Sequence, residues 1–303
     1  MSDNGTKSLS HITWSDLLFQ SISLFLIMST LICLLGLVFN LAIWGWPILS
    51  WDFLMNFPSR HAHQAGILSA WVGTCAVMLV TVTIALPLGI GSGIYLEEYA
   101  PKNWFTSFIE LTVSNLAGVP SIVYGLLALG VFVYGMGLGR SILTAGLTLA
   151  LLVLPIIIVS TREALRSVPQ NIREAVWALG SSQLQLIVHH LVPYSMSGIA
   201  TGSIIALSRA IGETAPLITI GALTFIAFLP ASPFQWEFPF VSFEWMYDAF
   251  TVMPIQMFNW ISRPGTDFLS NASATGFLLI AMTVIMNACA IILRNKARKN
   301  IKW

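Results

Sequence analysis

Long apolar runs separated by short polar segments make up most of this sequence. Six runs exceed the roughly 18 residues that a helix needs to cross the hydrocarbon core of a membrane. They cover residues 17–46, 67–95, 105–135, 141–160, 195–228 and 275–293. The pattern therefore predicts an all-α polytopic membrane protein with about six transmembrane helices. Because the number of spans is even, both termini are expected on the same side of the membrane.

The basic residues divide unequally between the two sets of loops. With both termini inside, ten of the fourteen lie in cytoplasmic segments: Lys7, Lys102, Arg162, Arg166, Arg173, Arg294, Lys296, Arg298, Lys299 and Lys302. Arg60, Arg140 and Arg263 fall outside, and Arg209 falls within a span. Cytoplasmic loops of membrane proteins are enriched in Lys and Arg, so the distribution predicts cytoplasmic termini.

This topology divides the chain into four parts. We expect a cytoplasmic N-terminal tail (1–16), a first span with its outer loop (17–66), a main membrane domain (67–293) and a basic cytoplasmic C-terminal tail (294–303). The main domain contains a cytoplasmic loop at about 162–193 and an outer loop at about 230–274. The first apolar run is too long for the core of a cleaved signal peptide, so it is expected to remain as a span.

Composition supports a membrane protein and excludes several other classes. Hydrophobic residues form 56% of the chain and charged residues 9%, and the net charge is only +1. No basic stripe with exposed aromatic residues is present, so nucleic-acid binding is not expected. Cys33, Cys75 and Cys289 stand singly in apolar runs and are expected to be buried small hydrophobes. His61 and His63 have a metal-compatible spacing without a third ligand, so no metal site is predicted.

Two polar signals interrupt the apolar pattern between residues 161 and 216. The first is a polar segment containing Glu174, Ala175, Gly180 and Pro193. This spacing is compatible with a short helix over about 170–183, a glycine turn, and a proline in the first turn of the next span. An ordinary cytoplasmic loop is the alternative interpretation.

The second signal is Arg209 with Glu213, two opposite charges inside an apolar run. An ionisable residue in a span is costly unless it is paired or hydrated, which makes both residues functional candidates. They lie four residues apart and share one helical face, which also includes Gly202 and Ala206. These two small residues leave room for a neighbouring helix or for a solute. A purely structural ion pair is the alternative.

A proline follows this charged pair and predicts a break in the helix. Pro216 cannot donate to the carbonyl of Gly212, so the helix is expected to break or kink beside Glu213. A new helix starting near Pro216, with Thr214 or Ala215 as its cap, would direct positive potential towards an anion. The planar donor fork of Arg209 also matches phosphate oxygens.

Catalytic and nucleotide-binding motifs are missing from the sequence. It contains no GxxxxGK[ST] phosphate-binding loop, and the glycines at 89, 91 and 93 are better explained by close helix packing than by a nucleotide loop. No Ser-His-Asp, HExxH or paired catalytic carboxylate grouping occurs. The chain is therefore not expected to be an enzyme, and any ATP would be hydrolysed by a partner.

The segment from Glu174 to Pro193 resembles the cytoplasmic loop of permease subunits in binding-protein-dependent ABC importers. The family pattern is E-A-A, three residues, G, nine residues, I-x-L-P, and this sequence departs from it at Val176, His190 and Val192. Further segments, at 96–101, 115–125, 162–169 and 209–216, resemble the phosphate-specific branch. The final Thr-Ala-Pro favours its PstA-type over its PstC-type permeases.

The resemblance implies a type I ABC importer permease in a bacterial cytoplasmic (inner) membrane. It would form half of a phosphate pathway, with a PstC-type sister permease, two copies of an ABC ATPase and an external phosphate-binding protein as partners. The chain itself would hold no cofactor, since ATP and Mg belong to the ATPase. The expected site residues are Arg209, Glu213 and Thr214 for the substrate pathway, and Arg173, Glu174, Ala175, Gly180 and Pro193 for coupling to the ATPase.

Two other functions remain open from the sequence. The same architecture would suit another oxyanion such as molybdate, and a membrane subunit that reports external phosphate to a sensor is a second alternative. Glu110 is expected at the headgroup region, against the loop helix or along the pathway. The aromatic outer loop, with Trp236, Trp245, Tyr247 and Trp260, is expected to anchor the membrane interface or to dock the external binding protein.

Overall fold

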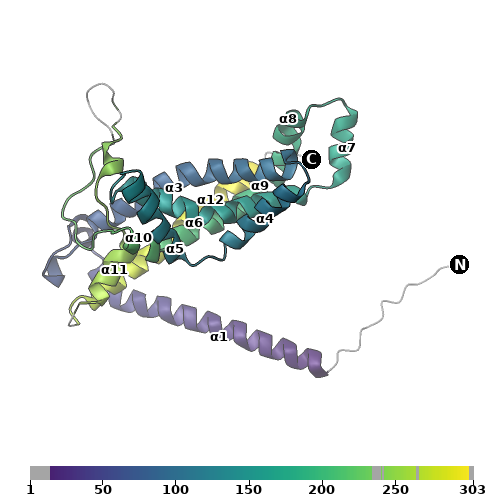
Figure 1. Cartoon of the computed structure of the whole chain (residues 1–303). Helices are drawn as coiled ribbons and strands as arrows, with labels where there is room; N and C mark the ends of the chain where they lie inside the picture. Colours follow the sequence, from purple (N-terminus) through teal and green to yellow (C-terminus); the bar gives the residue numbers. More distant parts are fainter. Residues whose placement is uncertain (1–13, 234–239, 241, 264–265, 300–303) are drawn as a thin grey trace.

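The computed structural model describes residues 14–233, 240, 242–263 and 266–299. Within these ranges the chain contains helices and no strand. Figure 1 shows an elongated bundle with α7 and α8 projecting at one end and α11 at the other. Most of the predicted N-terminal tail, Trp236, Lys7 and Lys302 lie outside the described residues.

Five described helices are long and apolar enough to cross a membrane. They are α1 (Trp14–Gly45), α3 (Leu68–Ile94), α6 (Ile142–Arg166), α9 (Val192–Gly212) and α12 (Leu269–Lys299). A sixth span is counted if α4 (Trp104–Leu116) and α5 with its extension (Ser121–Gly135) are taken together, although they are bent by 106°. The prediction of an all-α membrane protein with about six spans is therefore confirmed.

Shorter elements connect these spans. On the way from α1 to α3 lie η1 (Trp46–Ile48), α2 (Trp51–Met55) and η2 (Ala62–Gln64). The π-helical segments η3 (Tyr95–Tyr99), η4 (Leu129–Gly135) and η5 (Ile187–Leu191) continue or precede longer helices. The remaining elements are α7 (Gln170–Ala178), α8 (Gln183–Leu186), α10 (Ala215–Thr219), η6 (Glu244–Tyr247) and α11 (Met253–Ile261).

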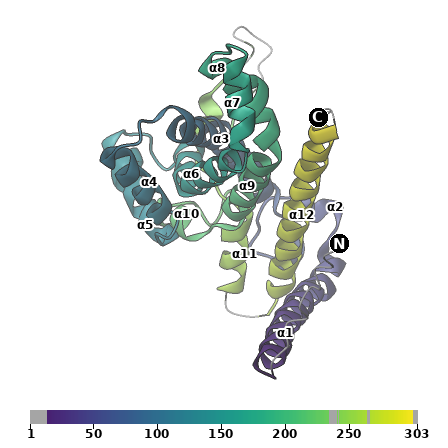
Figure 2. The ribbon, with the colours of Figure 1, turned by 90° about the vertical axis from the view of Figure 1, so that its right-hand side faces the viewer.

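Helix α6 is the centre of the bundle, and α3 and α9 pack along it (Figure 2). Small residues make this contact close: a β-carbon on Gly89 would lie 2.7 Å from Ile157, and one on Gly93 would lie 2.7 Å from Thr161. Both contacts join α3 to α6. The glycines near the end of α3 therefore permit close helix packing, as the sequence indicated, although Gly91 has no neighbour within 4 Å.

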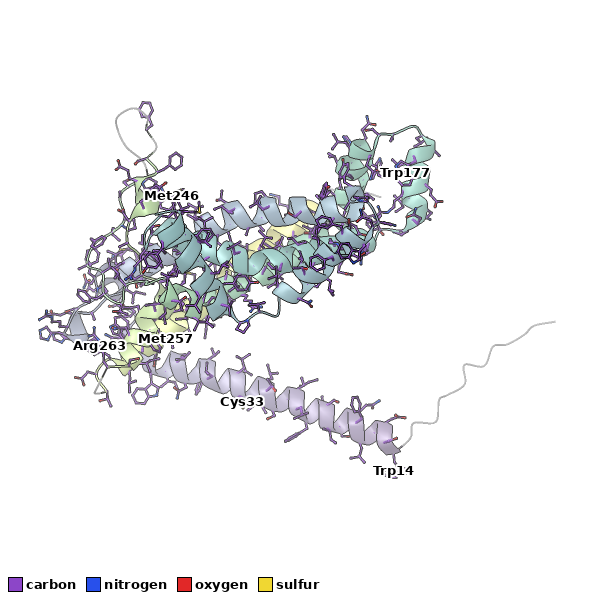
Figure 3. The ribbon with its side chains drawn as sticks, viewed as in Figure 1. Trp14, Cys33, Trp177, Met246, Met257 and Arg263 are labelled. Atoms are coloured by element: carbon purple, nitrogen blue, oxygen red, sulfur yellow. The ribbon has the colours of Figure 1, made fainter. Side chains whose placement is uncertain are left out.

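Helix α1 diverges from this bundle over most of its length (Figures 1 and 3). Its only buried residue is Gly45, where a β-carbon would lie 2.7 Å from the backbone of Ala274 in α12. Most of its other apolar side chains are exposed, as a lipid-facing helix requires. The cysteines do not behave as predicted, because Cys33, Cys75 and Cys289 are all exposed on the single subunit.

The outer segment after α10 corrects three expectations. The fifth span ends at Gly212 rather than near residue 228, and α12 begins at Leu269 rather than 275. Trp260 is fully buried between Phe53 and Phe268, and Trp245 is 8% exposed, so neither lies in an interfacial aromatic belt. Of the aromatic residues singled out above, Tyr247 is exposed, at 61%. Much of this segment is therefore folded core.

Candidate functional site

The helix that carries Arg209 ends just before Glu213. α9 stops at Gly212, Glu213 takes an extended conformation with ψ 124°, and α10 begins at Ala215. This confirms the predicted break next to Glu213. Thr214 occupies the N-cap position of α10 without a side-chain capping bond, and α10 has only five residues. A helix that short contributes little dipole, so the predicted helix-end field is not a feature of this site.

Arg209 and Glu213 form an ion pair across the end of α9. Nε of Arg209 donates to Oε1 of Glu213 at 3.2 Å, and the side chains are 44% and 17% exposed. The guanidinium is therefore held at one nitrogen while much of it stays accessible. The ion pair occupies Nε of Arg209, and the side chain stays 44% exposed.

The two small residues predicted on the same face lie against a neighbouring helix. A β-carbon on Gly202 would overlap the side chain of Ser160 in α6, and Ala206 is fully buried. Of the two uses that the sequence left open, the structure therefore favours helix packing over space for a solute. Arg209 instead shares its exposed face with Ile205, which is 61% exposed.

A second broken span lies beside the first. Between α4 and α5 the chain turns through 106°, and the hydroxyl of Tyr124 in α5 donates to the carbonyl of Leu116 at the end of α4 at 2.8 Å. α5 packs against α10, where Gly125 faces Pro216 and Thr219. Two interruptions of helical structure thus meet in the membrane domain, an arrangement typical of substrate sites in transporters.

Gly125 is expected to be essential for this packing. In the Gly125→Ala variant the new methyl group overlaps the Thr219 side chain and lies 2.7 Å from the Cα of Pro216. Overpacking of this kind costs about 1–3 kcal/mol, so we expect a melting temperature several degrees lower. The measurement is thermal unfolding of the purified protein in detergent. Gly130→Ala is the matched control because no atom lies within 4 Å of its β-carbon; equal melting temperatures for the two variants would contradict the packing.

The polar loop folds as two short helices joined by a tight turn. α7 ends at Ala178, so the predicted helix over 170–183 is shorter than expected. Gly180 has φ +78°, a conformation that favours glycine, and the prediction of a glycine turn is confirmed. Ser182 then forms a capping box with Gln185 at the start of α8. Pro193 lies in the first turn of α9, as predicted.

The side chains of the α7–α8 segment point in two directions. Glu174 and Ala175 are exposed, and so are Trp177 at 45% and Leu179 at 85%. Figure 3 shows Trp177 on α7, beyond the end of the bundle. Arg173 points the other way, towards the bundle, and its side chain is only 12% exposed. Sequence analysis did not single out Trp177 and Leu179, because the family motif does not include these positions.

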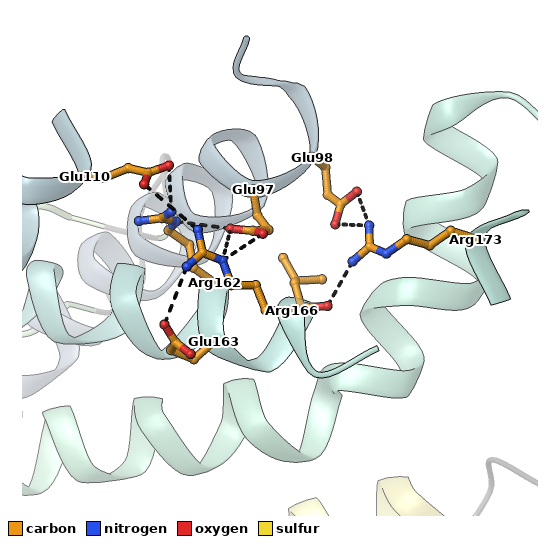
Figure 4. A network of polar contacts seen from close by, with 8 residues as sticks. Glu97, Glu98, Glu110, Arg162, Glu163, Arg166 and Arg173 are labelled. Atoms are coloured by element: carbon orange, nitrogen blue, oxygen red, sulfur yellow. Dashed lines mark hydrogen bonds and ion pairs between the residues drawn. The ribbon is translucent and has the colours of Figure 1, made fainter. Parts of the chain in front are cut away.

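A network of charges joins this segment to the bundle (Figure 4). Its closest ion pairs are Arg162 with Glu110 at 2.6 Å, Arg166 with Glu97 at 2.9 Å and Arg173 with Glu98 at 2.6 Å. Arg162 also lies 3.4 Å from Glu97. Glu110 is thus paired with the end of α6 rather than solvated alone in the headgroup region. The signal available in the sequence was the presence of acidic and basic groups at the ends of segments predicted to be cytoplasmic.

Comparisons with known proteins agree with this architecture. Residues 85–301 match the family described as binding-protein-dependent transport system inner membrane component. The probable ABC transporter permease protein YqgI of Bacillus subtilis is 36% identical over 191 residues, which are 63% of this chain and 65% of the relative. The chain thus spans slightly less than two thirds of that protein's length.

Two further matches extend over more of the chain. The phosphate transport system permease protein PstA of Xylella fastidiosa is 31% identical over 256 residues, 83% of each chain. Among solved structures, an inward-facing MetNI methionine ABC transporter superposes with a TM-score of 0.58 at 15% identity, covering 74% of this chain and 93% of that one. The second match shows a common fold only.

Proposed function

The chain belongs to the family of binding-protein-dependent transport system inner membrane components, and from this premise we propose that it is a permease subunit of an ATP-driven importer of inorganic phosphate. It forms half of the membrane pathway, with a PstC-type permease as the other half. A separate ABC ATPase, present in two copies, binds ATP and Mg, and an external binding protein delivers phosphate. Both termini and the α7–α8 segment face the cytoplasm.

One observation carries the substrate assignment: Arg209 keeps an accessible guanidinium at the end of a membrane helix. Arginine binds phosphate oxygens through two parallel N–H donors, and a site shielded from bulk water strengthens that interaction. The PstA proteins among the relatives are named for phosphate transport, which supports the same anion. Thr214, next to the break, adds a hydroxyl to the pathway lining.

Glu213 gives the pathway a means to select phosphate over sulfate. Phosphate near neutral pH carries a proton that it can donate to the Glu213 carboxylate, whereas sulfate would face the carboxylate as an unpaired like charge. We expect Glu213→Gln to make sulfate about tenfold more effective as a competitor, because like-charge repulsion is removed. The measurement is labelled-phosphate uptake against increasing sulfate, with Glu163→Gln, which neutralises an exposed carboxylate outside the pathway, as the control. If sulfate inhibits phosphate uptake equally in Glu213→Gln and in the unmodified protein, Glu213 does not set the selectivity.

The α7–α8 segment supports the assignment of a separate ATPase. Trp177 and Leu179 are exposed apolar side chains on a segment that projects from the end of the bundle, where water would surround them in the isolated chain. An amphipathic helix that places such residues in a groove of a partner is a common recognition mode. Glu174 and Ala175 lie exposed on the same helix, so α7 is the docking element in this proposal.

The test is competition for uptake in membrane vesicles that contain this chain and its partners. Labelled phosphate should accumulate, and unlabelled phosphate should compete far better than sulfate or molybdate. Preferential competition by molybdate would replace phosphate with that oxyanion. An assembled complex that accumulates neither phosphate nor molybdate but still alters phosphate signalling would favour a subunit that reports external phosphate.

A further inference from the structure

Glu98 contacts both halves of the α7–α8 segment although it belongs to a different span. It lies in η3, which continues α3. Nη1 of Arg173 in α7 donates to both carboxylate oxygens of Glu98 at 2.6 Å (Figure 4). Beyond the Gly180 turn, Nε2 of Gln183 donates to the backbone oxygen of Glu98 at 3.3 Å. We call Glu98, Arg173 and Gln183 the Glu98 junction; it fastens the segment to the end of α3 through both α7 and α8.

Burial separates this junction from the exposed charge contact between Glu163 and Arg166. The side chains of Glu98 and Arg173 are 3% and 12% exposed, whereas those of Glu163 and Arg166 are 68% and 48% exposed and lie 4.0 Å apart. Removing one partner of a buried pair leaves an uncompensated charge, while an exposed pair contributes little. The junction therefore resists separation, and Glu163 provides a matched acidic residue whose contact is weak.

The backbone links the α7–α8 segment directly to α6 and α9, but not to α3. Contact with α3 comes instead from the Glu98 junction and from Ile94. Ile94 packs against an apolar cluster formed by Leu165, Val168, Val176, Leu186, Ile187 and Leu191. Arg173 also reaches α6, where Nη2 donates to the carbonyl of Leu165 at 2.9 Å. One arginine thus holds the ends of two spans together, so a displacement of α7 acts on both.

At its opposite end, α3 contacts the first residue of α11 and the segment just before it. Oγ1 of Thr74 accepts a hydrogen bond from the backbone N–H of Met253 at 3.0 Å, and a β-carbon on Gly73 would overlap the carbonyl of Thr251. All the atoms of this contact are buried. α3 has 27 residues, and at 1.5 Å per residue it spans about 40 Å. It therefore links the Glu98 junction to the outer face of the bundle.

We propose that the Glu98 junction transmits movement of the α7–α8 segment to α3, and through α3 to the outer segment at residues 251–253. This rests on the proposed function, in which an ATPase moves α7. Glu98 and Arg173 act as positioning residues, because they contact neither the transported anion nor the nucleotide. A displacement imposed on α7 by ATP binding then reaches the face that receives the external binding protein.

The first test is the Glu98→Gln variant, in which the side chain keeps its size and loses its charge. In the purified complex we expect the ATPase to remain bound, while stimulation of ATP hydrolysis by the phosphate-loaded binding protein falls about tenfold, a size typical of coupling between sites. Glu163→Gln should retain full stimulation. Exchanging the charges, with Glu98→Arg and Arg173→Glu together, should restore more stimulation than either single change alone.

A distance measurement separates failure of the junction from failure of the proposed function. With Cys33, Cys75 and Cys289 replaced by serine, spin labels at Gln64 and Ala178 report the separation between the outer end of α3 and the loop. We expect ATP to leave this distance nearly unchanged in the unmodified complex, because α7 and α3 then move together, and to change it in Glu98→Gln, whichever ion is transported. If unmodified complexes fail to import phosphate, only the proposed function fails.

Three results would overturn the transmission role. The first is full stimulation in Glu98→Gln. The second is an ATP-dependent change of the label distance in the unmodified complex, or the absence of such a change in this variant. The third is loss of the ATPase from the Glu98→Gln complex that the double variant Glu98→Arg, Arg173→Glu does not restore. The junction would then only maintain the shape of the docking segment.

Discussion

Arg209→Ala is expected to abolish phosphate uptake while the complex still assembles. The variant removes the accessible donor fork at the end of α9, and a hydrogen bond to a charged group contributes about 1.5–3 kcal/mol. A loss of two such bonds from the transported ion corresponds to a reduction in uptake of about 100-fold or more. The measurement is ATP-dependent accumulation of labelled phosphate, normalised to the amount of assembled complex.

Arg209→Lys is the matched variant for this prediction. Lysine keeps the positive charge but lacks the planar fork, so we expect it to recover only part of the uptake. Melting temperatures of both variants should stay near that of the unmodified protein, because the Arg209 side chain is 44% exposed. Normal uptake by Arg209→Ala would remove this residue from the pathway.

Glu174→Ala is expected to have the second largest effect, in this case on ATPase docking. Glu174 is exposed on α7, close to Trp177 and Leu179, so an ATPase groove that receives this helix would bury its carboxylate. Truncating one partner of a buried charge pair at an interface costs about 2–5 kcal/mol. We therefore expect recovery of the ATPase with the affinity-purified permease to fall at least about tenfold.

Glu163→Ala is the control for the docking experiment. Glu163 is also an exposed glutamate near the charge network, but it lies on α6 and its one close ion pair, with Arg166, spans 4.0 Å. Its replacement should leave recovery of the ATPase unchanged. Equal recovery with Glu174→Ala and with the unmodified chain would contradict docking through Glu174.

The helix breaks illustrate what the sequence could and could not predict. Pro216 predicts the end of α9 because it cannot donate to the carbonyl of Gly212, and the structure has the break there. The 106° bend after Leu116 was missed, although Gly118 and Pro120 lie in it. Hydropathy stays high through that turn, and a sum over apolar residues does not register the direction of the backbone.

The charge network was hidden by distance along the chain. Arg166 and Glu97 are 69 positions apart, and Arg173 and Glu98 are 75 positions apart. Opposite charges at such separations pair only after α3, α6 and α7 are packed together. Burial of Trp245 and Trp260 was missed for a related reason, because an aromatic residue beside a span suits a lipid interface and a protein core equally well from sequence alone.

The central claim is that this chain provides half of an ATP-driven path for phosphate, and the most direct test is accumulation in proteoliposomes. These would contain the purified permease pair with its ATPase, with the loaded binding protein on the outer side and ATP inside. Labelled phosphate should accumulate with ATP and Mg and should not accumulate with a non-hydrolysable analogue. ATP hydrolysis by the assembled complex without any accumulation of phosphate would contradict it.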